Sequence, residues 1–248
     1  MHKIYENIFV GMFLYSLGIA AGIRFKEGHK LPPMSINLYQ QTPADRLIGD
    51  LFASFGGRSF IIEFKREDRA SDPKERAKYE LLKTTLYSDF EHLKNVSLYS
   101  HFFASASISE QNEPNIWLKP YIFLIHKKFE SFSLKSFIDG VLDGELNYGG
   151  TEEGPFFPVG CSGDSLREYL SLLGKLYLPA DSNVSLSNCG GLIINISKEG
   201  ALSYLSASNI INLTRSLELY YAREHEIISR EKSIEREISR DRFREMSR

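Results

Sequence analysis

The sequence has 248 residues, of which 42% are hydrophobic and 25% are charged, with a formal net charge of −2. This composition supplies enough apolar material for one sizeable core and excludes a disordered or fibrous chain. Because the net charge is close to zero, no global basic field indicates nucleic acid as a partner, and any such partner has to be argued from local residues.

The first segment of the chain is apolar. Residues 4–17 predict a helix with one early acid, Glu6, that ends at the glycines of residues 18–22. The apolar stretch 8–23 is shorter than the roughly 18 residues needed to span a bilayer. We therefore expect a helix packed against the protein and no membrane contact. A membrane-attached protein that uses this stretch is the alternative.

A β-hairpin is the strongest local prediction. Two runs rich in Phe, Ile and Leu, residues 47–55 and 58–66, flank Gly56-Gly57, a pair typical of a tight two-residue turn. In the register that this turn sets, both faces of the hairpin are largely apolar. We therefore expect other elements to cover both faces.

Three polar residues interrupt this apolar hairpin at its open end. Counting back from the turn, Asp50 lies directly opposite Glu63, with β-carbons about 5 Å apart. Lys65 lies two residues further along the same face. Because like charges that face each other destabilise a sheet, a cation bound between the two carboxylates is one compensation. Simple screening by Lys65 at a solvated strand end is the other.

The rest of the chain divides into helical and extended segments by its periodicity. Helices are predicted from Asp72-Pro73, at residues 133–142, at residues 164–177 with Ser162 or Asp164 as cap, and from Ser206 onward. Strands are predicted at residues 96–106, 117–126 and 191–196. Residues 148–163 contain Gly and Pro and are predicted to form a loop.

The polar residues of the hairpin, Asp50 and Glu63-Phe64-Lys65, resemble the PD-(D/E)xK, or restriction-endonuclease-like, superfamily. In that family one strand of a hairpin carries an acid, and the next carries an acid, any residue and a lysine. Gly49 stands where the family's name places a proline. The resemblance implies an α/β fold with a central mixed β-sheet flanked by helices, built as a restriction-endonuclease-like core with a helical C-terminal extension.

The same resemblance covers roughly the first half of the chain and suggests its organisation. Residues 1–130 would form the nuclease-like core, residues 131–221 an additional α/β region packed on the core, and residues 222–248 a charged helical tail. Almost every second residue of the tail is charged, which suits a solvated helix or a short coiled coil with a partner. The tail is therefore the expected surface for self-association or for a larger protein complex.

The resemblance implies a metal-dependent endonuclease that hydrolyses phosphodiester bonds, of DNA more than of RNA, in antiviral defence, restriction or repair. Asp50 and Glu63 would bind Mg²⁺ or Mn²⁺, which prefer carboxylate oxygens and water. Lys65 would orient the attacking water and stabilise the transition state. Glu6, on the preceding helix, would be a further catalytic acid.

Basic residues next to the hairpin are the expected contacts with nucleic acid. Arg66 ends the second strand, and Lys74 and Lys78 stand on the helix that follows it. Basic residues between positions 58 and 83 only slightly outnumber acidic ones, so phosphate contact is allowed rather than demanded.

Other residues bear on the compartment and on the alternative function. Cys161 and Cys189 lack the spacing of a disulfide framework or a zinc site, which favours reduced thiols in a cytoplasmic protein. His101 is interpreted as a strand histidine with a satisfied hydrogen bond rather than as a metal ligand. The alternative function is a catalytically inactive nuclease-fold interaction subunit that docks through residues 148–163 and the charged tail.

Overall fold

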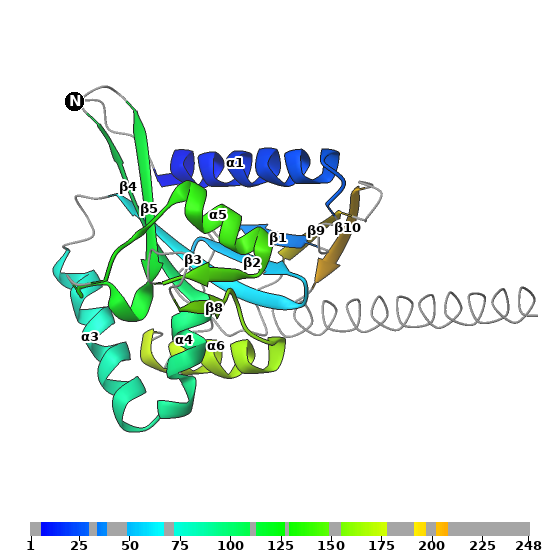
Figure 1. The fold of residues 1–248 in the computed structure, drawn as a ribbon. Helices are drawn as coiled ribbons and strands as arrows, with labels where there is room; N and C mark the ends of the chain where they lie inside the picture. The colour runs from blue at the N-terminus through cyan, green and yellow to red at the C-terminus, as the bar shows by residue number, and fades with distance from the viewer. Residues whose placement is uncertain are drawn as a thin grey trace, which may run out of the picture.

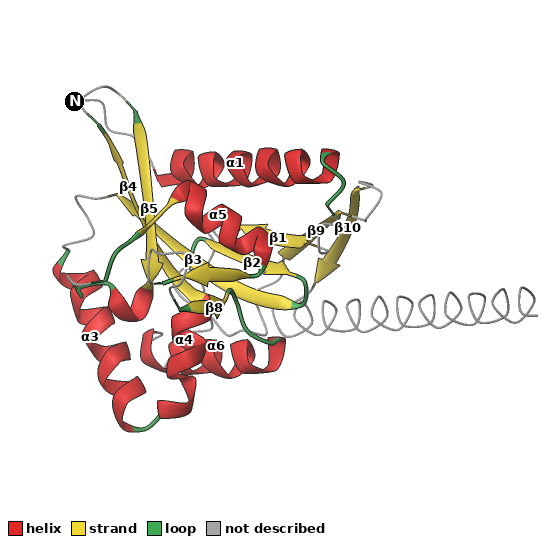
Figure 2. Cartoon of the chain, viewed as in Figure 1, coloured by secondary structure: helices red, strands yellow, loops and turns green. Residues whose placement is uncertain are grey.

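The structure is a computed structural model that describes residues 6–29, 34–38, 49–66, 72–109, 113–126, 129–148, 155–177, 191–196 and 202–207. Within these ranges the chain forms three layers, with one β-sheet between two layers of helices (Figure 1 and Figure 2). The predicted α/β class, with a mixed sheet flanked by helices, is confirmed.

The main sheet has eight strands in the order β10-β9-β1-β2-β3-β4-β5-β6. Their bounds are β1 Met34–Leu38, β2 Leu51–Phe55, β3 Arg58–Arg66, β4 His101–Ile108, β5 Pro114–Pro120, β6 Phe132–Ser133, β9 Gly191–Ile196 and β10 Leu202–Ala207. Neighbouring strands are antiparallel except for β3 and β4, which are parallel. Because parallel neighbours need a crossover, the chain passes between β3 and β4 through helices. A separate ribbon pairs β7 (Glu145–Asn147) with β8 (Phe156–Pro158).

Helices cover both faces of the sheet. One face carries α1 (Glu6–Lys26) and α5 (Leu134–Asp143), and the other carries α3 (Pro73–Ser88), α4 (Lys94–Ser100) and α6 (Gly163–Tyr177) (Figure 1). Two short 3₁₀ turns, η2 (Glu91–Leu93) and η3 (Tyr121–Phe123), join these elements. The residues after position 131 thus add strands to the same sheet and a helix to each of the two layers.

The hairpin of β2 and β3 has the predicted register. Gly56 and Gly57 both have positive φ values, of 56° and 82°, as a tight turn with this twist requires. The turn pairs Phe55 with Arg58 and Leu51 with Ile62. Side chains then alternate between the two helical layers, because successive residues of a strand point to opposite faces. The prediction that both faces are apolar and covered is confirmed.

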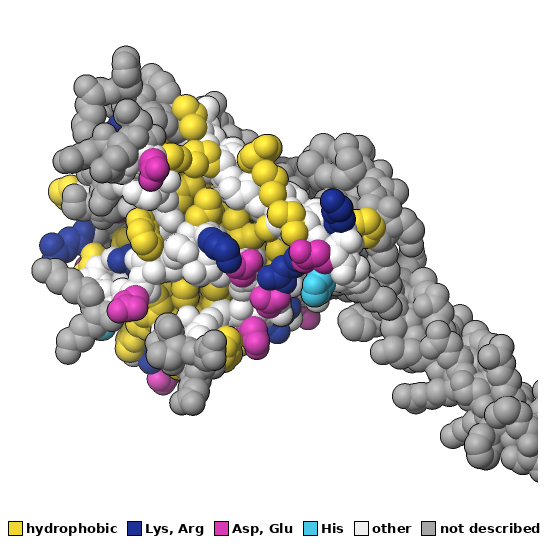
Figure 3. Space-filling model, turned by 45° about the horizontal axis from the view of Figure 1, so that its top comes forward, with side chains coloured by type: hydrophobic (Ala, Val, Ile, Leu, Met, Phe, Trp, Pro, Cys, Tyr) yellow, Lys and Arg dark blue, Asp and Glu magenta, His cyan; other side chains and the backbone are white. Residues whose placement is uncertain are grey.

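The first helix is longer than predicted. The glycines of residues 18–22 do not end α1, which continues to Lys26. A glycine costs a helix roughly 1 kcal/mol relative to alanine, and burial of the inner face, including Leu17 and Ala21, offsets that cost. The prediction that this segment is too short to span a membrane was therefore wrong. By length and composition, α1 could cross a membrane, and 28% of its most apolar 18-residue stretch is buried. Apolar side chains reach the surface on the α1 side of the molecule (Figure 3).

Two strand predictions need correction. The run 96–106 is not one strand, because α4 extends to Ser100 and β4 begins at His101. Short apolar runs do not distinguish a buried helix from a buried strand. The run 117–126 is also shifted, since β5 begins at Pro114 and ends at Pro120, where proline offers no N–H to continue the ladder. Residues 121–123 form η3 instead.

The later elements agree better with the sequence, except that the segment predicted as a loop, residues 148–163, contains the short strand β8. The Asp72 side chain caps α3 by accepting a hydrogen bond from the Lys74 N–H at 2.8 Å, and the Ser162 hydroxyl caps α6. The strand at residues 191–196 is β9. Ser206 lies in β10, so a helix does not begin there; the remainder of that predicted helix, with the tail 222–248, lies outside the described residues.

Candidate functional site

Asp50 and Glu63 both lie at the open end of the hairpin, each next to one member of the pair Leu51 and Ile62. Asp50 directly precedes β2; its N–H donates to the Ile62 carbonyl at 3.0 Å, and its Oδ2 accepts from the Phe64 N–H at 2.6 Å. Asp50 is 3% exposed and Glu63 is 7% exposed. Both side chains are thus buried at the same end of the hairpin, both act on the charge of Lys65, and the Asp50 carboxylate is fixed by the backbone of the partner strand.

Gly49 explains why no proline precedes Asp50. Its φ of 79° is accessible to glycine but not to proline, whose ring holds φ near −65°. A β-carbon at this position would lie 3.0 Å from the Ile62 carbonyl oxygen. The close approach of the two backbones at Gly49 therefore requires glycine, and it sets the position of Asp50.

Two ammonium groups neutralise Glu63. The Nζ atoms of Lys65 and Lys78 each lie 3.3 Å from Glu63 Oε1. Burial raises the pKa of Glu63, but the fields of Lys78 and Lys65 outweigh burial, so the net pKa shift is downward and the group is ionised at neutral pH. For Lys65, burial lowers the pKa, and the carboxylates of Glu63 and Asp50 more than reverse this effect. Lys65 is accordingly protonated.

A third acid, Glu75, belongs to the same cluster and was missed in the sequence. It stands one turn before Lys78 on α3, where residues three apart share a helix face. Its Oε2 is buried and has no hydrogen-bond partner among the described residues. Burial, and then the nearby charge of Glu63, raise the pKa of Glu75, while Lys78 and Lys65 lower it. The three-residue spacing between Glu75 and Lys78 was the available signal in the sequence. It places both side chains on one face of the helix, but it does not show that this face is turned toward Glu63.

Buried aromatic residues lie near Glu63. The Tyr121 ring stacks on His101 with the ring centroids 4.3 Å apart, and the buried Tyr121 hydroxyl has no hydrogen-bond partner within the part of the chain that the structure describes. His101 Nδ1 lies 2.8 Å from the Tyr169 hydroxyl, which confirms the expected hydrogen bond of this histidine. Burial lowers the pKa of His101 to about 3, against an opposing contribution from Glu63.

This histidine predicts a pH dependence of stability. Its pKa in the folded protein lies below the ordinary value of 6.5, so the unfolded chain takes up a proton that the native state does not. The contribution of His101 to stability is therefore complete above pH 6.5 and is lost as the pH falls toward 3. In His101→Gln, the free energy of unfolding should fall less steeply below pH 6, by up to about 1.4 kcal/mol per pH unit in chemical denaturation. The exposed His126 is the control: His126→Gln should keep the wild-type slope.

The other predicted site residues lie at different distances from the acids. Lys78 contacts Glu63 directly, whereas Lys74 is exposed in the first turn of α3 and Arg66 is half-buried at the end of β3. Glu6, the first residue of α1, contributes least of the four acids whose fields raise the pKa of Lys65. The structure therefore groups Asp50, Glu63, Lys65 and Lys78, whereas the charge of Glu6 acts more weakly on Lys65.

The donor set suits a hard divalent cation with water in its coordination shell. Asp50 and Glu63 offer carboxylate oxygens, and Mg²⁺ commonly takes one or two carboxylates and completes its octahedron with water or substrate oxygens. Within the described ranges, no group of three or more His, Cys, Asp or Glu side chains is arranged to hold a metal. A site here would thus be a two-carboxylate site rather than a protein cage.

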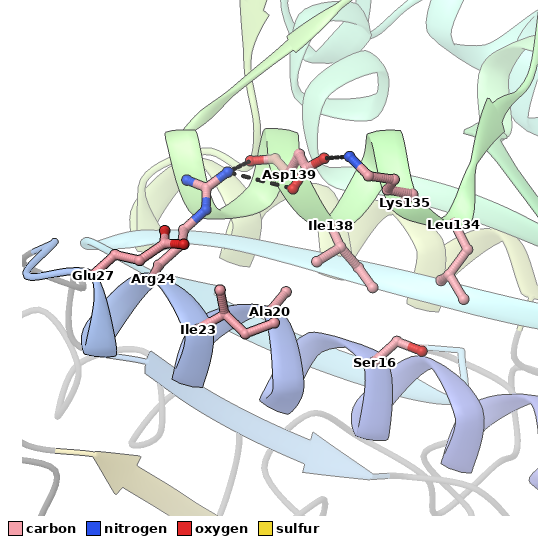
Figure 4. A pocket seen from close by; sticks show the side chains of 9 residues that line it. All are labelled: Ser16, Ala20, Ile23, Arg24, Glu27, Leu134, Lys135, Ile138 and Asp139. Atoms are coloured by element: carbon pink, nitrogen blue, oxygen red, sulfur yellow. Dashed lines mark hydrogen bonds and ion pairs between the residues drawn. The ribbon is translucent and has the colours of Figure 1, made fainter.

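A hollow on the opposite helical layer is separate from this cluster. It has a volume of about 530 Å³ and lies between α1 and α5 (Figure 4). Its apolar walls end at an ion-paired group in which Asp139 binds Arg24 at 3.4 Å and Lys135 at 2.7 Å. Because these charges satisfy one another, the hollow offers no set of convergent polar groups of the kind found around Glu63.

Comparisons of the chain with protein-family models, with curated proteins and with solved structures gave no match. What this cluster does has to be inferred from its geometry and charge.

Proposed function

We propose that the protein is a metal-dependent nuclease with a restriction-endonuclease-like core, which hydrolyses phosphodiester bonds of DNA in the cytoplasm. The observation that supports this proposal is that Asp50 and Glu63 are both buried at the open end of the hairpin, and that the charges of both act on the protonated Lys65. Buried carboxylates are costly unless something pairs with them. A buried group of acids and lysines at one end of an otherwise apolar hairpin favours a functional role.

The side chains of the cluster have distinct roles in this proposal. Asp50 and Glu63 would hold Mg²⁺ or Mn²⁺, which when bound would lower the pKa of a coordinated water and offset charge on the phosphate. Lys65 is a fixed positive charge beside the place where negative charge would develop. Because the pKa of Lys65 is raised, it would act as a charge and hydrogen-bond donor and not as a general base.

Nucleic acid would approach past α3. Lys74 is exposed in the first turn of this helix, and Arg66 is the last residue of β3, directly after Lys65. Contacts from such residues to phosphates position a nucleic acid without reading its sequence. Defence against phage, restriction and repair are the roles that suit a nuclease of this kind.

The direct test is cleavage by the purified wild-type protein. Supercoiled plasmid, single-stranded DNA and RNA are incubated with Mg²⁺ or Mn²⁺ and, in parallel, with EDTA. We expect metal-dependent cleavage of DNA, little cleavage of RNA, and complete loss of cleavage in EDTA, because the carboxylates supply no nucleophile by themselves. Absence of cleavage together with absence of Mn²⁺ binding in calorimetry would favour the inactive interaction subunit instead.

A further inference from the structure

The two lysines that contact Glu63 differ in how firmly they are held. Both reach the same oxygen, Oε1, at 3.3 Å. Lys65 is on the same strand as Glu63, is 17% exposed, and lies in the combined field of the neighbouring acids. Lys78 reaches across from α3 and is 29% exposed. Lys78 therefore has more freedom to leave Glu63 than Lys65 has.

A second partner is available to Lys78 without any movement of the helix. Glu75 precedes it by one turn, and no described residue forms a hydrogen bond with its buried Oε2. Side chains three residues apart on a helix can form an ion pair. The Tyr177 ring lies 4.9 Å from the Lys78 ammonium and favours a cation at this edge of the cluster.

A divalent cation on Glu63 would compete with Lys78 for the same oxygen. In the metal-free cluster, the carboxylates of Asp50 and Glu63 are opposed by the ammonium groups of Lys65 and Lys78, while burial raises the pKa of Glu75. Addition of a dication makes the cluster positive, so repulsion then acts on the least restrained ammonium group. That group is Lys78.

We propose that Lys78 is an internal competitor of the metal ion, which pairs with Glu63 while the site is metal-free and transfers to Glu75 when a cation binds. This inference rests on the proposed metal site. After the transfer, Lys78 would stand at the exposed edge of the cluster, where a substrate phosphate could bind it. The exchange would limit occupation of the site by metal alone and would couple metal binding to substrate binding.

The primary experiment measures Mn²⁺ affinity of the full chain by calorimetry, without nucleic acid. Lys78→Met keeps an apolar stem of similar length and removes the competing charge, so we expect it to bind Mn²⁺ about tenfold more tightly than wild type. Lys83→Met is the matched control, since Lys83 is also on α3 and lies 5.7 Å over the Tyr79 ring, with no contact to Glu63. It should bind Mn²⁺ as wild type does.

Glu75→Gln separates an exchange of partners from a general effect of charge. If charges act independently, the effects of Glu75→Gln and Lys78→Met on Mn²⁺ affinity should add in the double variant. If Lys78 moves to Glu75, Glu75→Gln should weaken Mn²⁺ binding clearly more in the presence of Lys78 than in its absence. Equal effects of Glu75→Gln in both backgrounds, or no tighter binding by Lys78→Met, would overturn the exchange.

The outcomes also separate this inference from the proposed function. Wild type that binds no Mn²⁺ contradicts both. Wild type that binds Mn²⁺ and cleaves DNA, with Lys78→Met unchanged in affinity, contradicts the exchange alone. Tighter Mn²⁺ binding by Lys78→Met, together with a larger effect of Glu75→Gln in the presence of Lys78, in a protein that does not cleave would support the exchange and reject the nuclease. Thermal unfolding of each variant, followed by circular dichroism, verifies that the compared proteins are folded.

Discussion

Glu63→Gln is expected to reduce metal-dependent DNA cleavage by at least about 100-fold. Glutamine keeps the size of the side chain but removes the charge that would bind the cation. It also leaves the ammonium groups of Lys65 and Lys78, each 3.3 Å from Oε1 in the wild type, without their common counter-ion. Initial rates on supercoiled plasmid in Mg²⁺ measure the effect.

Loss of a buried counter-ion can also destabilise the fold, so a second variant is needed. Asp50→Asn serves because the asparagine oxygen can still accept the hydrogen bond from the Phe64 N–H, which Asp50 Oδ2 accepts in the wild type at 2.6 Å. We expect it to cleave as poorly as Glu63→Gln while unfolding at nearly the wild-type temperature. Glu168→Gln is the control, because Glu168 is exposed on α6 and pairs only with His92 among the described contacts. Wild-type cleavage by Asp50→Asn and Glu63→Gln would place the active site elsewhere.

The part of the site that the sequence predicts is the part set by local geometry. Two glycines in a turn fix which residues of the flanking strands face each other, and the alternation of side chains then fixes the faces. Asp50, Glu63 and Lys65 could be placed in this way because all three lie on, or directly next to, the two strands that this turn joins.

Glu75 and Tyr121 could not be placed by the same reasoning. The contribution of Glu75 depends on where α3, which lies between β3 and β4 in the chain, packs against the sheet. The periodicity of a helix does not predict where that helix packs. Tyr121 reaches the cluster because β5 ends at Pro120 and the chain turns into η3. Both positions are consequences of tertiary packing, which local sequence patterns do not predict.

The same distinction holds for the fold. The cap of α3 at Asp72 and the bounds of α6 follow from local signals. The pairing of β1 with β9 joins segments far apart in the sequence, and no periodicity within either strand specifies its neighbour. The continuation of α1 through Gly18 and Gly22 likewise depends on burial against the sheet, which outweighs the helix propensity of glycine.

Phe137→Ala is expected to lower the free energy of unfolding by about 3–5 kcal/mol. Phe137 is on α5, is fully buried, and its ring centroid lies 4.8 Å from that of Phe102, 6.1 Å from that of Phe60 and 6.2 Å from that of Phe13. It therefore joins α5 to α1 and to the central strands β3 and β4. Chemical denaturation of the purified variant measures the change.

Phe25→Ala is the matched control, because Phe25 is 46% exposed on α1 and its removal leaves no cavity. It should change the free energy of unfolding by less than about 1 kcal/mol. A loss as small as this in Phe137→Ala would mean that α5 packs loosely on the sheet and that the first 130 residues hold their core without it. With the expected loss, against a total stability of about 5–15 kcal/mol for a typical domain, the hairpin that carries Asp50 and Glu63 depends on an element from the second half of the chain. The geometry of the acid pair would then be a property of the whole sheet and both of its helical layers.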